Sequence, residues 1–312
     1  MEIPVYLITG FLDGGKTHFI RETLQDPNFT EQEKSLLIVC EEGEEEYDAD
    51  FCRRTNCVVQ VVEDLSELTT ENLRKWDDQY KPDRVIMEYN GMWQLSELNN
   101  VMLPKGWICY QTIDVCDSTT FTLYQNNMRS LMSDKFQMAE MVLFNRCTPE
   151  IDKNQMARSV RVVNRRCQLG FERPDGTEDT TFVETSPFDL EADIIEIAND
   201  DYGLWYTEIM DEPKKYRNKT VRFLAQVCID PKFPKNSFAL GRHAMVCCAD
   251  DIAYLAMICK AEKQPMPKHE GWVTLTAEVK VELNPLYGDR GPVLYAKSIE
   301  PAEEPKNRLL YF

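Results

Sequence analysis

The sequence predicts an α/β domain with a mostly parallel sheet, followed by a small β-rich domain. Short apolar runs alternate with amphipathic stretches in the first half, which is typical of strands joined by helices. Beyond residue 212 the apolar runs follow one another with little helical pattern between them. Residues 1–212 carry 19 Lys and Arg against 42 Asp and Glu, whereas residues 213–312 carry 16 against 11. These changes predict a domain boundary at about residues 205–215.

Length and composition restrict the class of protein. The chain has 312 residues, 43% of them hydrophobic, which suffices for two domains with cores of their own. No window approaches the ~20 apolar residues of a membrane helix, so we expect no membrane insertion. Glu2 stands where a secretory signal carries basic residues, which predicts a cytoplasmic protein. The 11 cysteines are then expected to be core thiols, metal ligands or reactive groups.

The elements of the first domain, residues 1–205, follow from its apolar runs. Short runs bounded by polar residues predict buried strands, and apolar residues at helical spacing predict helices. Residues 170–205 form an acidic segment after the last helix. The predicted strands are 5–8, 36–39, 58–62, 85–87, 108–113, 141–144 and 181–183, and the predicted helices are 17–24, 66–79, 118–132 and 150–163.

The second domain, residues 215–312, contains five short predicted strands, which suit a small barrel of the OB type. Its charge is only modestly positive and it has few surface aromatic residues, so we expect no nucleic-acid partner. The strands are predicted at 220–228, 239–248, 252–259, 272–281 and 293–299.

Residues 10–17 form a candidate phosphate-binding loop. They read Gly-Phe-Leu-Asp-Gly-Gly-Lys-Thr, which fits the pattern G-x-x-x-x-G-K-S/T between a predicted strand and a predicted helix. The backbone N–H groups of such a loop converge on the phosphates of a nucleotide. Lys16 would reach the β- and γ-phosphates, and the Thr17 hydroxyl would bind Mg²⁺. The sequence therefore predicts a nucleoside triphosphate and magnesium as ligands.

Further motifs follow this loop in a fixed order. They are Cys40-Glu41-Glu42-Gly43-Glu44, Glu88-Tyr89-Asn90-Gly91, Ile113-Asp114 and Asn145-Arg146-Cys147-Thr148. Together with residues 9–17 they resemble the CobW-type P-loop GTPases, a cobalamin-synthesis and metal-chaperone-like family. That family carries T-G-F-L-G-x-G-K-T, N-E-x-G-E, E-x-x-G, V-D and N-K-x-D. The resemblance covers about residues 3–165 and implies a P-loop NTPase fold.

The resemblance also implies a role for each site residue. Lys16 and Glu88 are the expected catalytic residues, since Lys16 neutralises phosphate charge and Glu88 orients water or contacts Mg²⁺ through water. Magnesium is expected to bind at Thr17, Glu41 and Glu88, with Glu44 in the same segment. The nucleotide is expected to contact Gly10, Asp13, Gly14, Gly15, Lys16, Thr17, His18, Asn145 and Arg146.

Two positions depart from the family pattern. Thr148 stands where the family has an Asp that accepts hydrogen bonds from guanine, and a hydroxyl cannot form that charged pair. GTP is the nucleotide that the resemblance implies, with ATP as the alternative. The family's C-x-C-C metal motif is also missing, and Cys57 with Cys52 is what remains of it. These two thiols are either half of a zinc site or part of the core.

Residues 216–312 resemble the small domain of YcgQ-type, permease-associated proteins. The most specific motif is Arg-His-Ala-Met-Val-Cys-Cys-Ala-Asp at residues 242–250. On a strand, His243 and Cys247 share one face while Cys248 points to the other, and Asp250 or Asp251 follows at the turn. This arrangement is either a zinc or cobalt site or a buried thiol pair within a barrel.

The function predicted from these motifs is hydrolysis of a nucleoside triphosphate in metal homeostasis or transporter-linked regulation. The expected partners are the nucleotide and a metal-dependent client or a permease. One alternative is a scaffold or metal-binding regulatory protein that binds nucleotide without turnover. A P-loop kinase or ligase is a third class, for which the sequence shows no acceptor site.

Overall fold

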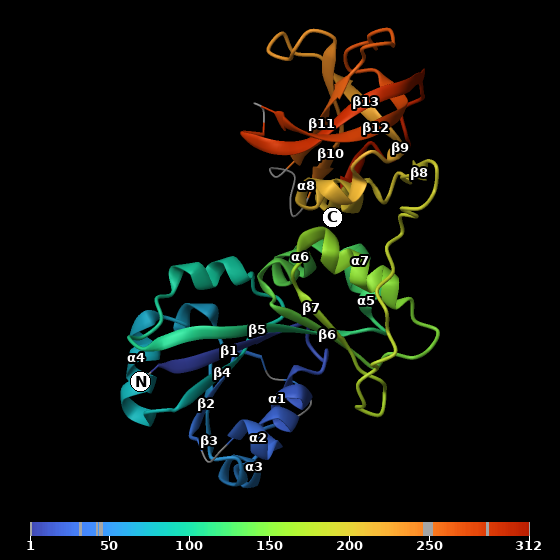
Figure 1. The fold of residues 1–312 in the computed structure, drawn as a ribbon. Coiled ribbons are helices and arrows are strands. Elements are labelled where there is room, and N and C mark those ends of the chain that lie inside the picture. The colour runs from blue at the N-terminus through green and yellow to red at the C-terminus, as the bar shows by residue number, and fades with distance from the viewer. Residues whose placement is uncertain are drawn as a thin grey trace. The chain divides into compact units, whose positions relative to one another are not determined.

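The computed structural model describes residues 2–30, 33–41, 43, 46–245, 252–284 and 287–311. The chain divides into two compact units, Met1–Val183 and Glu184–Phe312 (Figure 1). Residues 184–205, which the sequence analysis groups with the first domain, thus belong to the second unit. Among the described helices, none has the length and apolar character that crossing a bilayer requires.

The first unit is built on a seven-stranded parallel sheet in the order β3-β2-β4-β1-β5-β6-β7. The central strands are apolar and buried, as a sheet covered on both faces requires. This confirms the predicted mostly parallel α/β fold. The strands are β1 (Ile3–Thr9), β2 (Ser35–Val39), β3 (Cys57–Val61), β4 (Arg84–Glu88), β5 (Trp107–Asp117), β6 (Met141–Asn145) and β7 (Gln168–Phe171).

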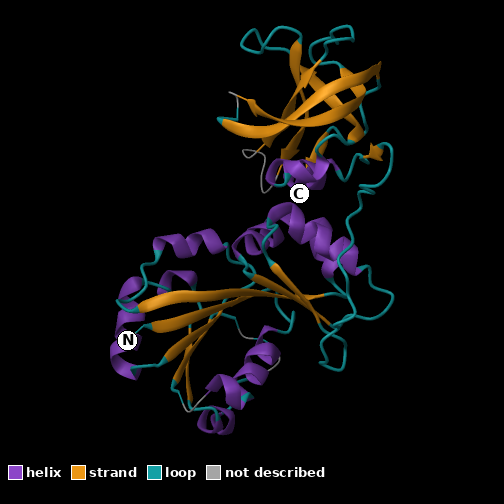
Figure 2. Cartoon of the chain, viewed as in Figure 1, coloured by secondary structure: helices purple, strands orange, loops and turns teal. Residues whose placement is uncertain are grey.

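Helices cover both faces of this sheet (Figure 2). On one face, Ile20 and Leu24 of α1 and Phe51 of α3 pack on the strands. On the other, Trp76 of α4 and Phe136 of α6 belong to two further apolar clusters. The helices are α1 (Lys16–Gln25), α2 (Pro27–Thr30), α3 (Ala49–Arg54), α4 (Thr70–Tyr80), α5 (Phe121–Asn127), α6 (Arg129–Met138) and α7 (Lys153–Val163), with 3-10 turns η1 (Leu65–Glu67) and η2 (Leu95–Asn100).

The predicted strand at residues 181–183 is wrong, because these residues form no strand. The Asp179 carboxylate accepts hydrogen bonds from the Thr181 backbone N–H (3.0 Å) and from its hydroxyl (2.5 Å). An Asp that binds the backbone two residues ahead fixes a turn and removes a donor from any strand ladder. The seventh strand is instead β7, and Phe182 packs its ring on Phe171 of that strand at a centroid distance of 4.4 Å.

The second unit contains a mixed, β-rich sheet in the order β14-β10-β11-β13-β12-β9-β8, with β9 also paired to β10. These pairings join five strands in a closed ring, β9-β10-β11-β13-β12. Assignment of this ring to the OB type stays a prediction. The strands are β8 (Ile195–Glu196), β9 (Thr220–Cys228), β10 (Ser237–Met245), β11 (Ile252–Lys260), β12 (Trp272–Asn284), β13 (Asp289–Pro301) and β14 (Leu309–Tyr311).

Two elements before residue 212 belong to this second unit. Strand β8 pairs in parallel with β9. Helix α8 (Tyr202–Asp211), followed by the 3-10 turn η3 (Pro213–Tyr216), buries Trp205 with its ring 4.7 Å from that of Phe223 on β9. The acidic composition of this stretch made α8 difficult to predict from the sequence, although the helix has an apolar face that covers the sheet.

Candidate functional site

The phosphate loop connects β1 to α1 at the carboxyl edge of the parallel sheet, where α/β proteins bind ligands. Two glycines determine the backbone conformation of the loop. Gly10 has φ +136°, and a Cβ on it would lie 2.2 Å from the Val115 carbonyl oxygen. Gly15 has φ +99°, and its Cβ would lie 2.4 Å from Asn145 Nδ2. Both positions therefore require glycine for backbone conformation and for close approach.

Gly10→Ala is expected to lower the free energy of unfolding of the first unit by about 3 kcal/mol, since backbone strain and overpacking each cost about 1–3 kcal/mol. Gly176→Ala is the matched control, because Gly176 also has positive φ but open space around its Cβ position. The control should lose only about 1 kcal/mol. Urea denaturation measures both values, and equal losses would contradict the assigned clash.

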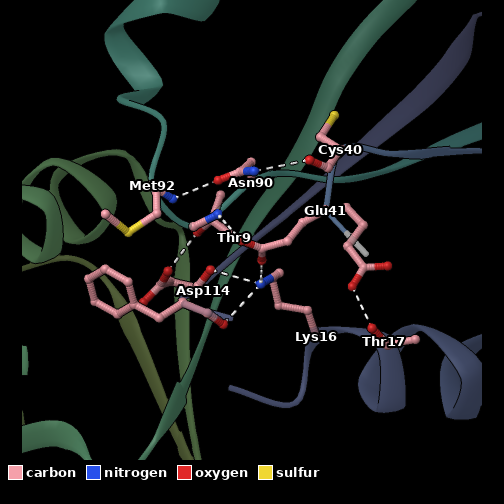
Figure 3. Close-up of polar contacts among 12 residues, drawn as sticks. Thr9, Lys16, Thr17, Cys40, Glu41, Asn90, Met92 and Asp114 are labelled. Carbon is pink, nitrogen blue, oxygen red and sulfur yellow. Dashed lines mark hydrogen bonds and ion pairs between the residues drawn. The ribbon is translucent and has the colours of Figure 1, made fainter. Parts of the chain in front are cut away.

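Lys16 is the cation of the loop, and its side chain is only 4% exposed. Its Nζ donates hydrogen bonds to the carbonyl oxygens of Gly10 (3.0 Å) and Phe11 (2.9 Å) and lies 2.5 Å from Glu41 Oε2 (Figure 3). The other Glu41 oxygen accepts a bond from the Gly91 backbone N–H at 3.3 Å. Glu41 therefore pairs with Lys16, a contact that its position in the sequence did not predict, and its role toward magnesium stays a prediction.

Thr17 and Glu88 form the oxygen-rich part of the site. The Thr17 hydroxyl donates to Glu88 Oε1 at 2.6 Å, and the Tyr47 hydroxyl donates to Glu88 Oε2 at 2.6 Å. Glu88 ends β4 and is 2% exposed. Burial raises the pKa of this carboxyl, although the two hydroxyls and Lys16 act in the opposite direction. Tyr47, in the loop before α3, matches no motif and could not be found from the sequence.

Two hydrogen bonds from the end of β6 hold the phosphate loop in place. Asn145 Nδ2, at the end of β6, donates to the Gly14 carbonyl oxygen at 2.7 Å, and Arg146 donates to the Asp13 carbonyl oxygen at 3.1 Å. Arg146 also pairs with Asp117. The predicted nucleotide-contacting residues of the N-K-x-D-like motif are thus brought against the phosphate loop.

Two further predicted motifs meet the same edge of the sheet. Thr9 donates its hydroxyl to Asp114 Oδ1 at 2.7 Å, and burial raises the pKa of the Asp114 carboxyl (Figure 3). Asn90, after β4, donates to the Cys40 carbonyl oxygen at 3.2 Å and accepts from the Met92 backbone N–H at 2.8 Å. The loop after β4 is thereby tied to the end of β2.

A cleft of about 530 Å³ opens over the phosphate loop. His18 lies in it, next to Glu22, with 3.4 Å between Nε2 and Oε1. The turn after β7, residues 172–176, also lines the cleft, and sequence reasoning missed it. The Pro-Asp-Gly sequence at residues 174–176 predicts a turn, but it does not predict that this turn lines the cleft. The lining residues are Leu12, Asp13, Gly15, Lys16, Thr17, His18, Glu22, Glu41, Gly43, Glu88, Asn145, Arg146, Glu172, Arg173, Pro174, Asp175 and Gly176.

The candidate transition-metal residues lie elsewhere. His243 is on β10, with its ring 4.9 Å from that of Tyr254. Burial raises the pKa of the Cys52 thiol to about 12, and its hydrogen bond to Cys57 acts in the same direction. Within the described residues, no three His, Cys, Asp or Glu side chains are grouped to hold a metal. The candidates Glu44, Cys247, Cys248, Asp250 and Asp251 lie outside the described residues.

The donor set fits a magnesium-bound nucleoside triphosphate. Gly15 lines the cleft and has no Cβ, so the backbone there can approach phosphate closely. Lys16 supplies a cation, and Thr17 and Glu88 supply the oxygen ligands that Mg²⁺ prefers. Glu41, which is paired with Lys16, must leave it before a phosphate takes its place.

The chain is similar to known protein families and to solved structures. Residues 175–312 match the family described as DUF1980 C-terminal domain. A search of the curated proteins gives no match. Among solved structures, hydrogenase maturation factor HypB from Archaeoglobus fulgidus aligns at 13% identity and TM-score 0.42, over 57% of this chain and 84% of that one. The Zn(II)-bound YjiA GTPase from E. coli and a Zn(II)-bound triple mutant of it each align at 15% identity and TM-score 0.44. Each alignment covers 88% of this chain and 93% of the other.

Residues 4–170 match the family described as CobW/HypB/UreG, nucleotide-binding domain, which is more than half of the chain. The matched range contains the phosphate loop, Glu88 and Asn145. The chain therefore belongs to the CobW/HypB/UreG family of P-loop GTPases, and its first unit is the nucleotide-binding domain of that family.

Proposed function

We propose that the chain binds GTP with magnesium in the cleft over residues 10–17 and hydrolyses it to GDP and phosphate. The observation that carries this proposal is the buried Lys16 ammonium. It is bonded to a carbonyl oxygen of the glycine-rich phosphate loop, next to the hydrogen-bonded Thr17 and Glu88 side chains. The loop and Lys16 bind the phosphate chain and neutralise the charge that develops on the γ-phosphate during attack by water. Glu88, at the end of its strand, orients a water molecule.

Magnesium bound at Thr17 and Glu88 supplies positive charge to the phosphate oxygens. The hydroxyl of Thr17 is already turned to the Glu88 carboxylate, and Tyr47 holds that carboxylate from its other side. These contacts fix the two oxygen ligands before the nucleotide enters. Asn145 and Arg146 hold the phosphate loop against β6 and keep its backbone donors aimed at the cleft.

Titration calorimetry with GTP in the presence of Mg²⁺ tests binding, and release of inorganic phosphate tests turnover. Heat of binding together with phosphate release supports the proposal. Binding without release would leave a nucleotide-dependent scaffold, and no binding of any purine triphosphate would overturn the proposal.

Glu41→Gln is expected to tighten GTP binding by about 5- to 10-fold when EDTA removes divalent metal. The Glu41 carboxylate forms an ion pair with Lys16 and therefore competes with phosphate for the same cation. If Glu41 instead acts as a magnesium ligand, the variant will bind metal-free GTP with unchanged affinity and lose affinity only when magnesium is present. Gly91, which donates to the same carboxylate, can still donate to the amide oxygen.

We further propose that this GTPase works in metal homeostasis or in transporter-linked regulation. Membership in the CobW/HypB/UreG family supports the first role, and the resemblance of residues 216–312 to permease-associated proteins supports the second. The client is then a metal-dependent protein or a permease. Zinc and cobalt stoichiometry, measured with and without GTP, tests the metal role, and absence of both metals in both states would argue against it.

A further inference from the structure

Six described carboxylates line the cleft, and most of them already have a partner. Glu22 lies beside His18, Glu41 pairs with Lys16, and Glu88 accepts from two hydroxyls. Asp175 accepts from the backbone N–H (3.0 Å) and hydroxyl (2.6 Å) of Thr177. Within the described part of the chain, the Asp13 and Glu172 carboxylates have no hydrogen bond or ion pair. Asp13 belongs to the phosphate loop, whereas Glu172 belongs to the turn after β7.

The backbone of Glu172 is fixed beside the Asn145–Cys147 segment. Its N–H donates to the Phe144 carbonyl oxygen at 2.8 Å, and its carbonyl oxygen accepts from the Cys147 N–H at 2.8 Å. The side chain is half-buried in the cleft wall. Burial and the neighbouring Glu22 raise the pKa of Glu172, while His18 and Arg146 lower it. His18, in the first turn of α1, and Arg146, directly after β6, line the same cleft as Glu172.

Thr148, at the place of the family's base-reading Asp, is not among the residues that line the cleft. Its hydroxyl is bonded to the Glu150 carboxylate, which lowers the pKa of Glu150. The family that this chain resembles has its base-reading Asp at this place in the motif, so the chain needs another acceptor if it recognises guanine.

Guanine and adenine differ at the edge that a carboxylate would contact. Guanine presents two donors, N1–H and the 2-amino group, which a carboxylate accepts in parallel. Adenine presents an unprotonated N1 at the same place, which a carboxylate repels. A half-buried carboxylate without a described partner is stabilised by the two hydrogen bonds from guanine. Beside adenine it has no donor to accept from.

We propose that Glu172 is the residue that reads the base in this cleft, and that it selects guanine over adenine. This proposal rests on the proposed function, because it concerns the nucleotide of the same site. His18 and Arg146 flank the same space, on the side of α1 and of β6 respectively. Of the two cleft carboxylates without a described partner, Glu172 is the one outside the phosphate loop, so it is the one that we assign to the edge of the ring.

The test is titration calorimetry of the full chain and of Glu172→Gln with GTP, ATP and xanthosine triphosphate, each with Mg²⁺. The amide keeps one acceptor and adds a donor, which suits the 2-carbonyl of xanthine instead of the 2-amino group of guanine. We expect GTP affinity to fall by about 10- to 100-fold and xanthosine triphosphate affinity to rise by about 10-fold. Glu172→Ala should lose the GTP preference without gaining the xanthine nucleotide.

Two matched controls accompany this series. Glu178→Gln changes an exposed carboxylate two residues after this turn, outside the cleft lining, and Thr148→Ala removes the hydroxyl at the family's base-reading position. Both should keep the GTP preference. Unchanged nucleotide preference in Glu172→Gln, a preference of the parent chain for ATP, or a lost preference in Thr148→Ala would each overturn the assignment and leave nucleotide binding intact. Absence of all nucleotide binding by the parent chain would overturn the proposed function itself.

Discussion

Lys16→Ala is expected to reduce kcat/KM for GTP hydrolysis by about 10²- to 10³-fold, the loss typical for removal of one preorganised group that stabilises transition-state charge. The ammonium is buried, so its field on a phosphate is weakly screened by water. Neither Arg146 nor Arg173, the other cations of the cleft lining, belongs to the phosphate loop. Phosphate release under steady-state conditions measures the effect. Lys75→Ala, an exposed lysine on α4, is the matched control and should keep the parent rate.

The same substitution leaves the Glu41 carboxylate without its counter-ion, and that side chain is only 10% exposed. Some loss of stability is therefore expected, because an unpaired buried charge is costly. The double variant Lys16→Ala, Glu41→Gln separates the two effects, since it should regain stability and remain inactive. Recovery of hydrolysis in the double variant would show that the single variant failed through misfolding, and parental rates in Lys16→Ala would contradict the role of the ammonium.

Much of the first unit could be predicted because its signals are local. The strand, glycine loop and helix from Ile3 to Gln25 follow from adjacent residues, and each buried strand of the sheet needs only a short apolar run. The strand predicted at residues 181–183 failed because the apolar and β-branched pattern there is the same as in a strand. A single carboxylate, Asp179, decides between the two structures by holding the backbone in a turn.

The parts of the site that the sequence did not predict depend on residues far apart in the chain. Tyr47 approaches Glu88 only because β2 and β4 are neighbours in the sheet, and Glu172 reaches the cleft because β7 is paired with β6. The Lys16–Glu41 pair likewise requires the end of β2 to lie beside the phosphate loop. Spacing along the sequence contains none of this information, and the role of Glu41 toward magnesium stays a prediction beside the observed pair with Lys16.

Glu88→Gln is expected to lower kcat for GTP hydrolysis by about 10²- to 10³-fold while GTP affinity changes by less than about 10-fold. The amide oxygen can still accept from Thr17 or Tyr47, so the local structure should persist. The negative charge that orients water is lost. Single-turnover hydrolysis and calorimetry measure kcat and affinity separately, and Glu140→Gln, an exposed residue before β6, is the matched control.

The pH profile gives this prediction a second, independent readout. Burial raises the pKa of Glu88, and the charged form is the active one, so hydrolysis should decline as pH falls through a value above that of an exposed glutamate. The Gln variant has no group to protonate there and should lack this decline of hydrolysis at acidic pH.

A magnesium titration then separates the two roles of Glu88. If the carboxylate acts through magnesium, high metal concentration should restore part of the activity of the variant, whereas a carboxylate that orients the attacking water cannot be replaced by added metal.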